Sequence, residues 1–169
     1  MTLLYAAWKL AAFAIGACMG SLAGVAIHRI PEHQSLLSPG SRCDVCHTPV
    51  TPKDNIPLVS WLALGARCRA CHHPIPPLYP LLELHTGLVA WLIFDRFVPS
   101  AAFLDLPHLA AAALWGLFAW LLLLATWLDL RARIIPELAS LWAIPLGVAT
   151  AALLPALGYD GWLAIGWRA

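Results

Sequence analysis

Four cysteines recur in two short copies of one motif. The stretch RCDVCHTPV at 42–50 returns as RCRACHHPI at 67–75. Together the copies give the spacing C-x2-C-x21-C-x2-C, in which two tight turns each offer a pair of thiolates to one tetrahedral ion. This pattern is typical of a structural zinc site of the zinc-ribbon kind. The predicted zinc ligands are Cys43, Cys46, Cys68 and Cys71.

Three other uses of these cysteines compete with zinc. Structural disulfides belong to oxidising compartments, and a thioredoxin-type redox motif would need a βαβ context that the sequence does not predict. Each copy also reads C-x-x-C-H, with His47 and His72 in the last position, which is the attachment motif of c-type haem. Haem of this type is attached outside the cytoplasm. The side of the membrane on which the cysteines lie therefore distinguishes zinc from haem, its sharpest alternative.

The elements that must position these cysteines are membrane helices. The 169 residues are 61% hydrophobic and only 11% charged, and the mean hydropathy is +0.76, outside the range of ordinary soluble domains. A helix needs about 20 predominantly apolar residues to cross a bilayer. We therefore predict an all-α polytopic membrane protein with about four transmembrane helices. The predicted spans are 3–27, 81–98, 108–128 and 138–157.

The first span carries three features of its own. Gly16, Gly20 and Gly24 fall four residues apart, which predicts a stripe that lets a second helix approach closely. Lys9 lies near one end, and we expect its ammonium to extend to the interface. Cys18 is expected to be a small buried apolar residue. The long apolar run has no Ala-x-Ala cleavage site after it, so we interpret it as a retained helix rather than a signal peptide.

Lys and Arg are distributed unevenly among the loops. They are frequent in 28–80 and present in 129–137 as Arg131 and Arg133, whereas 95–107 has only Arg96. By the positive-inside rule, the first two loops face the cytoplasm and the N-terminus lies outside. The predicted domains are a transmembrane helix at 1–27, a cytoplasmic four-Cys zinc-binding domain at 28–80, and transmembrane helices 2 to 4 with the start of a truncated fifth at 81–169. The net charge of +1 and the lack of a basic stripe do not indicate nucleic-acid binding.

Five local motifs, in order, resemble one known family. GSLAGVAIHRIP (20–31), SPGSRCDVCHTPV, DNIPLVSWLALGARCRACHHPI and YPLLELHTG (79–87) are similar to the N-terminal half of the type IV prepilin leader peptidase/N-methyltransferase family. WLDLRARIIPELASL (127–141) resembles the segment that bears the family's first catalytic aspartate, which falls on Asp129. The resemblance implies a multi-pass protein of the bacterial inner membrane, in contact with lipid.

The resemblance also implies an activity. Members of the family are GxGD-type aspartic endopeptidases that cleave the leaders of prepilins or pseudopilins at the cytoplasmic face, and they methylate the new N-terminus with S-adenosylmethionine. Gly65 and Ala66 stand where the family commonly has Arg-Gly, and Gly24 where it commonly has Asn. S-adenosylmethionine therefore rests on the resemblance alone, and the residues that would bind it are unassigned.

An aspartic peptidase needs two carboxylates that share one proton. The family places its second aspartate in a Gly-x-Gly-Asp motif farther along than the 40 residues that follow Asp129, so we expect this chain to lack it. Asp160 lies beyond the fourth span, about 30 Å away across the bilayer, and Glu137 is better explained as a helix-start carboxylate. A C-terminal half on another chain would complete the site.

Two function classes follow. The first is an enzyme of this family. The second is a non-enzymatic zinc-ribbon membrane scaffold of a pilus or type II secretion system, for which Asp129 would only pair with Arg131 or Arg133. Glu83 and His85, near the start of the second span, are either functional or simply in the wet interface, and we favour the interface.

Overall fold

The regular structure of the chain is helical. The computed structural model describes residues 2–99, 105–133, 141–142 and 144–150, and in this part of the chain the long helices are α1 (Thr2–Arg29), α3 (Leu78–Phe97) and α4 (Leu106–Ala132). A short 3-10 helix, η1 (Pro52–Asp54), and a one-turn helix, α2 (Val59–Ala63), lie between α1 and α3. The predicted all-α class is therefore confirmed for the described residues.

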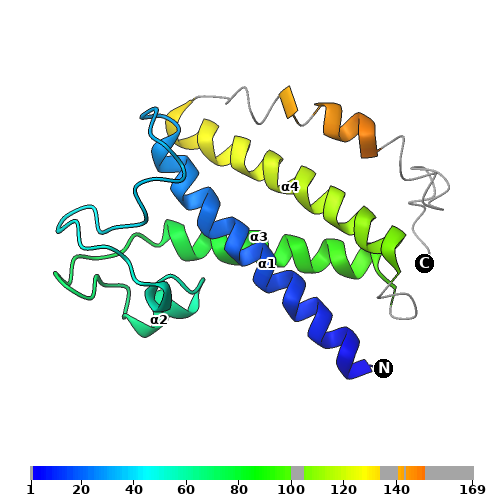
Figure 1. The fold of residues 1–169 in the computed structure, drawn as a ribbon, viewed down its shortest axis with the longest axis horizontal. Coiled ribbons are helices and arrows are strands. Elements are labelled where there is room, and N and C mark those ends of the chain that lie inside the picture. Colours follow the sequence, from blue (N-terminus) through cyan, green and yellow to red (C-terminus); the bar gives the residue numbers. More distant parts are fainter. Residues whose placement is uncertain (1, 100–104, 134–140, 143, 151–169) are drawn as a thin grey trace.

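The three long helices alternate in direction. Figure 1 shows that α1 ends, α3 begins and α4 ends on the same side of the molecule, beside the segment that contains the cysteines. Residues 40–77, here called the Cys lobe, lie at this end of the bundle. The end of α4 and the Cys lobe therefore lie on the same side of the helix bundle.

Two helices of the described part are long and apolar enough to cross a membrane, Leu3–Arg29 and Leu106–Ala132. They correspond to the first and third predicted spans, each extended by a few residues. The second predicted span is also a helix, α3, but it carries Glu83, Asp95 and Arg96 and does not meet the same criterion. The fourth predicted span lies largely outside the described residues, of which 141–142 and 144–150 are helical.

The glycine stripe of α1 packs directly on α3. A Cβ atom added at Gly16 would lie 2.5 Å from the Cβ of Ala90. One added at Gly20 would lie 2.6 Å from the Cα of Glu83 and would also collide with the hydroxyl of Thr86. Only a residue without a side chain fits at such separations, because real Cβ atoms keep more than 3 Å from such neighbours. The predicted close approach is thus confirmed, and its partner is α3.

The core lies where the three helices meet near the Cys lobe. Small residues of α1 pack there against leucines of α3 and α4. The indole N–H of Trp120 donates a 2.9 Å hydrogen bond to the carbonyl of Met19, which ties α4 to α1. The buried members of this core are Ala23, Ala26, Ile27, Leu82, Leu124 and Leu128.

Two side chains of α1 that the sequence singles out are Lys9, which pairs with α3, and Cys18, whose predicted burial is wrong. The ammonium of Lys9 lies 2.6 Å from the carboxylate of Asp95 and 4.9 Å from the centre of the Trp91 ring. The pair draws Lys9 into the contact between α1 and α3, where a charge in apolar surroundings is stabilised by its partner. Cys18 is exposed rather than buried, because it lies on a face of α1 that α3 and α4 leave uncovered.

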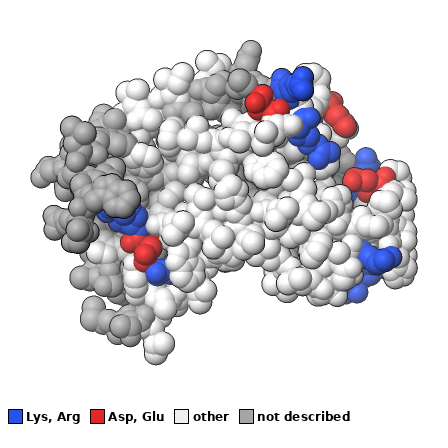
Figure 2. Space-filling view, turned by 180° about the vertical axis from the view of Figure 1, so that it is seen from behind, with Lys and Arg blue, Asp and Glu red and all other residues white. Residues whose placement is uncertain are grey.

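Charged side chains gather toward the two ends of the molecule. Figure 2 shows clusters of Lys, Arg, Asp and Glu near each end, with a broad uncharged belt between them on the face drawn. A surface of this kind suits a helix bundle whose middle contacts hydrocarbon, since apolar side chains carry no desolvation penalty there.

Candidate metal centre

The two Cys-rich copies fold into the same turn. In the first, the N–H of Cys43 donates to the carbonyl of Thr48 and the N–H of His47 donates to the carbonyl of Cys43, both at 3.0 Å. The second copy repeats both bonds, from Cys68 to His73 at 2.9 Å and from His72 to Cys68 at 3.0 Å. Each motif thus builds a tight turn that aims its two thiols to one side.

The last residue of each C-x-x-C-H copy has left-handed backbone. His47 has φ 56° and His72 has φ 57°. A left-handed residue reverses the chain immediately after the second cysteine of each copy. The two histidines are therefore equivalent parts of the two turns, which continue into the bridges Arg42–Pro49 and Arg67–Pro74.

The four thiols converge on one point. All four Sγ atoms lie within 4.8 Å of one another, and none is in a disulfide. Cys43 and Cys71 lie 3.7 Å apart, and Cys46 and Cys68 lie 3.9 Å apart, so the close pairs connect one turn with the other. A tetrahedral ion with sulfur bonds of about 2.3 Å, the value for zinc, separates its sulfurs by about 3.8 Å. The cluster could therefore hold a metal ion of this size.

The thiols do not ionise alike. The Thr48 hydroxyl, 3.3 Å from the sulfur of Cys46, and the Thr48 backbone N–H lower the pKa of Cys46 to about 6. For Cys71, the backbone N–H of His73 favours the thiolate, but burial and the three neighbouring thiols outweigh it and raise its pKa to about 12. Thiolates less than 4 Å apart repel one another, so their ionisation is coupled.

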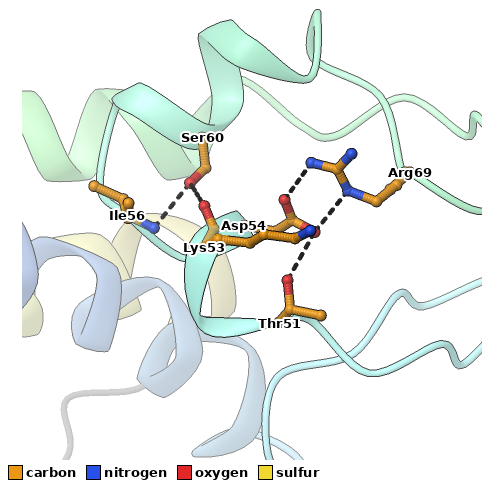
Figure 3. Close-up of polar contacts among 6 residues, drawn as sticks. All are labelled: Thr51, Lys53, Asp54, Ile56, Ser60 and Arg69. Carbon is orange, nitrogen blue, oxygen red and sulfur yellow. Dashed lines mark hydrogen bonds and ion pairs between the residues drawn. The ribbon is translucent and has the colours of Figure 1, made fainter.

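An ion pair braces the second Cys turn against η1. The guanidinium of Arg69 donates to both carboxylate oxygens of Asp54, from Nε at 2.9 Å and from Nη2 at 2.6 Å (Figure 3). The hydroxyl of Thr51 lies 3.0 Å from the same carboxylate. The Arg69 bonds hold the pKa of Asp54 at about 2, well below its ordinary range. Arg69 stands between two of the clustered cysteines, so the pair ties η1 to the thiol cluster.

A buried carboxylate joins the Cys lobe to the helices. Glu83 of α3 is only 8% exposed, and its Oε2 accepts a 2.7 Å hydrogen bond from the N–H of Leu58, the residue before α2. Ser21 of α1 lies beside the same carboxylate. Glu83 is therefore not exposed to water as a simple interfacial side chain would be, because the lobe folds back over it. His85 is exposed, as an interfacial residue would be.

A cavity of about 780 Å³ separates the Cys lobe from the ends of the helices. On the helix side its wall includes His28, Tyr79, Glu83 and Arg131. The rings of His28 and Tyr79 stack with centres 5.6 Å apart, and the guanidinium of Arg131 lies 3.3 Å from His28 Nδ1. The cavity therefore lies where all three helices and the lobe meet.

Asp129 is exposed near the end of α4. The helix closes at Arg133, whose left-handed backbone lets its N–H donate to the carbonyl of Asp129 at 2.8 Å. The carboxylate of Asp129 forms no ion pair among the described residues, so it pairs with neither Arg131 nor Arg133. Glu137 and Asp160 lie outside the described residues. Asp129 lies at the same end of the bundle as the Cys lobe (Figure 1).

Sequence reasoning identified the four cysteines and singled out Glu83 without its partner, but it missed Arg69 and Asp54. Arg69, Asp54 and Glu83 act through partners 15 and 25 positions away. The available signal was a carboxylate at the start of an otherwise apolar helix, which usually marks a functional or structural contact.

Comparison with known proteins gives a consistent result. Residues 14–97 match the family described as Bacterial Peptidase A24 N-terminal domain. Proteins named prepilin leader peptidase/N-methyltransferase are 43% identical over 111 residues in Myxococcus xanthus (strain DK1622), and 34% identical over 145 residues in Klebsiella pneumoniae. A third, from Pectobacterium carotovorum subsp. carotovorum, is 32% identical over 166 residues.

These matches cover 57%, 80% and 82% of this chain, and 33%, 60% and 56% of the relatives. The chain thus spans about a third to three fifths of the length of the curated relatives it matches. No solved structure matches it significantly. The N-terminal part of the chain, which contains the four clustered cysteines and Glu83, belongs to the prepilin leader peptidase/N-methyltransferase family.

Proposed function

We propose that this protein is a prepilin leader peptidase/N-methyltransferase-like membrane protein that acts on prepilins or pseudopilins at the cytoplasmic face of the bacterial inner membrane. One observation carries the proposal. The thiol cluster of the Cys lobe and Asp129 of α4 lie at the same end of the helix bundle, in a chain whose residues 14–97 match the family. The names of the relatives support both activities.

The proposed ion of the Cys lobe is structural zinc, held by Cys43, Cys46, Cys68 and Cys71. Sulfur separations of 3.7 and 3.9 Å support a small tetrahedral ion. When bound, zinc supplies folding free energy to a segment that has few buried apolar residues of its own. Four coordinating sulfurs leave no open position, which suits a structural role rather than a catalytic one.

Asp129 is the proposed first catalytic aspartate. In an aspartic peptidase, one carboxylate accepts a proton from the attacking water while the other, protonated, polarises the peptide carbonyl. The exposed position of Asp129 beside the final apolar turns of α4 supports such a role, since water and an extended peptide can both reach it. The second carboxylate would come from outside the described residues or from another polypeptide. Methyl transfer from S-adenosylmethionine is proposed from the family alone.

A cleavage assay with matched variants tests the peptidase. The chain is reconstituted in vesicles with a prepilin, alone and together with a polypeptide that carries a Gly-x-Gly-Asp segment. Asp129→Asn should abolish cleavage wherever the unchanged chain supports it, while Asp105→Asn, at the opposite end of α4, should retain it. Undiminished cleavage by Asp129→Asn would refute the assignment.

A second candidate function is a non-enzymatic membrane scaffold. The observation that favours it is the fully built thiol cluster, which can organise the Cys lobe without any catalytic carboxylate. A chain that binds prepilin in a crosslinking assay but cleaves it under neither condition would support this function. Metal analysis of the same preparation separates zinc from haem, because a haem protein is red and gives a haemochrome spectrum.

A further inference from the structure

The short helix α2 buries a polar side chain and exposes apolar ones, the reverse of what is expected for a protein in water. Its one buried residue is polar: the hydroxyl of Ser60 accepts a hydrogen bond from the N–H of Ile56 at 2.8 Å and donates to the carbonyl of Lys53 at 3.0 Å (Figure 3). Val59 and Leu62, three positions apart and therefore on one side of the helix, are 58% and 71% exposed. Neither lines the cavity between the lobe and the helices.

The position of α2 is fixed by the helix bundle. The residue before it, Leu58, is held by the buried Glu83 in the second turn of α3, and Glu83 lies against Gly20 of α1. Gly20 is well inside the apolar helix Leu3–Arg29. Figure 1 likewise draws α2 beside the first turns of α3, whereas the rest of the lobe extends away from the bundle. The short helix therefore lies level with the last apolar turns of α1.

The neighbouring surfaces at this level are also apolar and uncovered. On α3, Leu81, Leu84 and Leu88 form an outward stripe that is 41% to 53% exposed, and on α1 Leu22 is 40% exposed. Exposed apolar side chains therefore occur on α1, α3 and α2 at the same level of the bundle, and in a membrane protein such side chains contact lipid.

We propose that Val59 and Leu62 of α2 insert into the interfacial layer of the bilayer, so that the Cys lobe rests on the membrane surface instead of standing clear of it. The occupant of this face is lipid. The proposal rests on the membrane placement made under Proposed function. Short amphipathic helices bind the interface in this way, with apolar side chains at the boundary between headgroups and acyl chains.

Photo-crosslinking of the full chain tests this contact. Benzoylphenylalanine replaces one residue at a time, the protein is reconstituted with zinc in vesicles of phosphatidylcholine and phosphatidylglycerol, and adducts are identified by mass spectrometry after irradiation. Leu62 and Val59 are the test positions, and Leu88 of α3 is the positive control. Val45, an exposed apolar residue of the first Cys turn, is the matched control within the lobe. Zinc content shows that each variant keeps a folded lobe.

The expected result is a lipid adduct at Leu62 and Val59 with a yield close to that at Leu88 and at least about five times that at Val45. Lipid adducts at Leu88 but not at the two test positions would overturn the proposal and leave the membrane placement intact. No lipid adduct at Leu88 either would overturn both. Adducts from Leu62 to a second copy of the chain, or to another segment of it, would show that protein covers α2 and would equally refute the inference.

Discussion

The backbone N–H of Leu58 donates a 2.7 Å hydrogen bond to the buried carboxylate of Glu83, 25 residues away. Leu58 has φ 63°, a left-handed conformation that a leucine seldom adopts without support from its surroundings. Glu83 therefore both holds the Cys lobe against α3 and stabilises the turn into α2.

Removal of this acceptor should loosen the lobe. Glu83→Ala leaves the N–H of Leu58 without its partner, so the attachment should weaken by about 1–3 kcal/mol. Glu83→Gln keeps an acceptor oxygen and should cost less. Hydrogen exchange of residues 56–63 in the zinc-loaded protein measures the effect, and the exposed His85→Ala on the same helix serves as the control. Equal exchange in all three variants would contradict this role.

The contact between α1 and α3 should tolerate no added side chain. Gly20→Ala places a methyl group 2.6 Å from the Cα of Glu83 and from the carbonyl of Leu82, which are backbone atoms that cannot rotate away. We expect a loss of about 1–3 kcal/mol in stability from the forced separation of the helices.

Gly116→Ala is the matched control for this change. Gly116 lies within α4, and nothing stands within 4 Å of an added Cβ. The same substitution there should be neutral or should stabilise by up to about 1 kcal/mol, because alanine favours a helix over glycine. Unfolding by sodium dodecyl sulfate in mixed micelles compares the two. Similar effects at both positions would mean that α1 and α3 do not approach this closely.

Lys9 and Asp95 should be coupled. Their side chains are 19% and 49% exposed, so each single change, Lys9→Met or Asp95→Leu, should cost about 1–3 kcal/mol by leaving a charge without its partner. The double variant should recover part of that loss. A double-mutant cycle measured by the same unfolding method gives the coupling energy, and strictly additive losses would show that the pair contributes nothing.

The zinc proposal makes a prediction about the lobe alone. Purified protein should contain one zinc ion per chain, and Cys46→Ser should lose it, whereas Cys18→Ser, on the exposed face of α1, should keep it. A strong chelator should make residues 40–77 sensitive to protease while α1, α3 and α4 persist, because the helices pack without the metal. Full protease resistance after complete metal removal would argue against a structural ion.

The Asp54–Arg69 pair predicts a defined pH dependence. The pKa of Asp54 is lowered from an ordinary value of 3.8 to about 2, so the pair stabilises the lobe fully above about pH 4, and its contribution disappears as the pH falls toward 2. The difference in lobe stability between the wild type and Arg69→Gln should therefore be constant from pH 5 to 8 and shrink at lower pH. A difference that grows on acidification would be inconsistent with this ion pair.

The sequence predicts features that depend on spacing within one segment. Two cysteines three positions apart define a turn, and Gly16, Gly20 and Gly24 define one face of a helix, so the thiol cluster and the α1 contact face could both be foreseen. The long apolar runs gave the helices to within a few residues.

The remaining features depend on how separate segments meet. Lys9 contacts Asp95 because α1 packs on α3, and Glu83 contacts Leu58 because the lobe folds back on α3. The paired residues are 86 and 25 positions apart, and no local sequence pattern predicts contacts at such separations. Cys18 was mispredicted for the same reason, because burial along a helix depends on which of its faces meets a neighbour.

The helices α1 and α3 are joined to each other by different kinds of contact from those that hold α4. The two helices are joined toward one end by Lys9 and Asp95 and farther along by direct backbone approach at the glycines, while Glu83 ties α3 to the Cys lobe. The helices α1 and α3 and the lobe therefore form one connected unit. Against this unit α4 is held mainly by leucine packing, by the indole bond of Trp120 to Met19 and by the contact of Arg131 with His28. A tilt of α4 against α1 and α3 would therefore change the position of Asp129 relative to the thiol cluster.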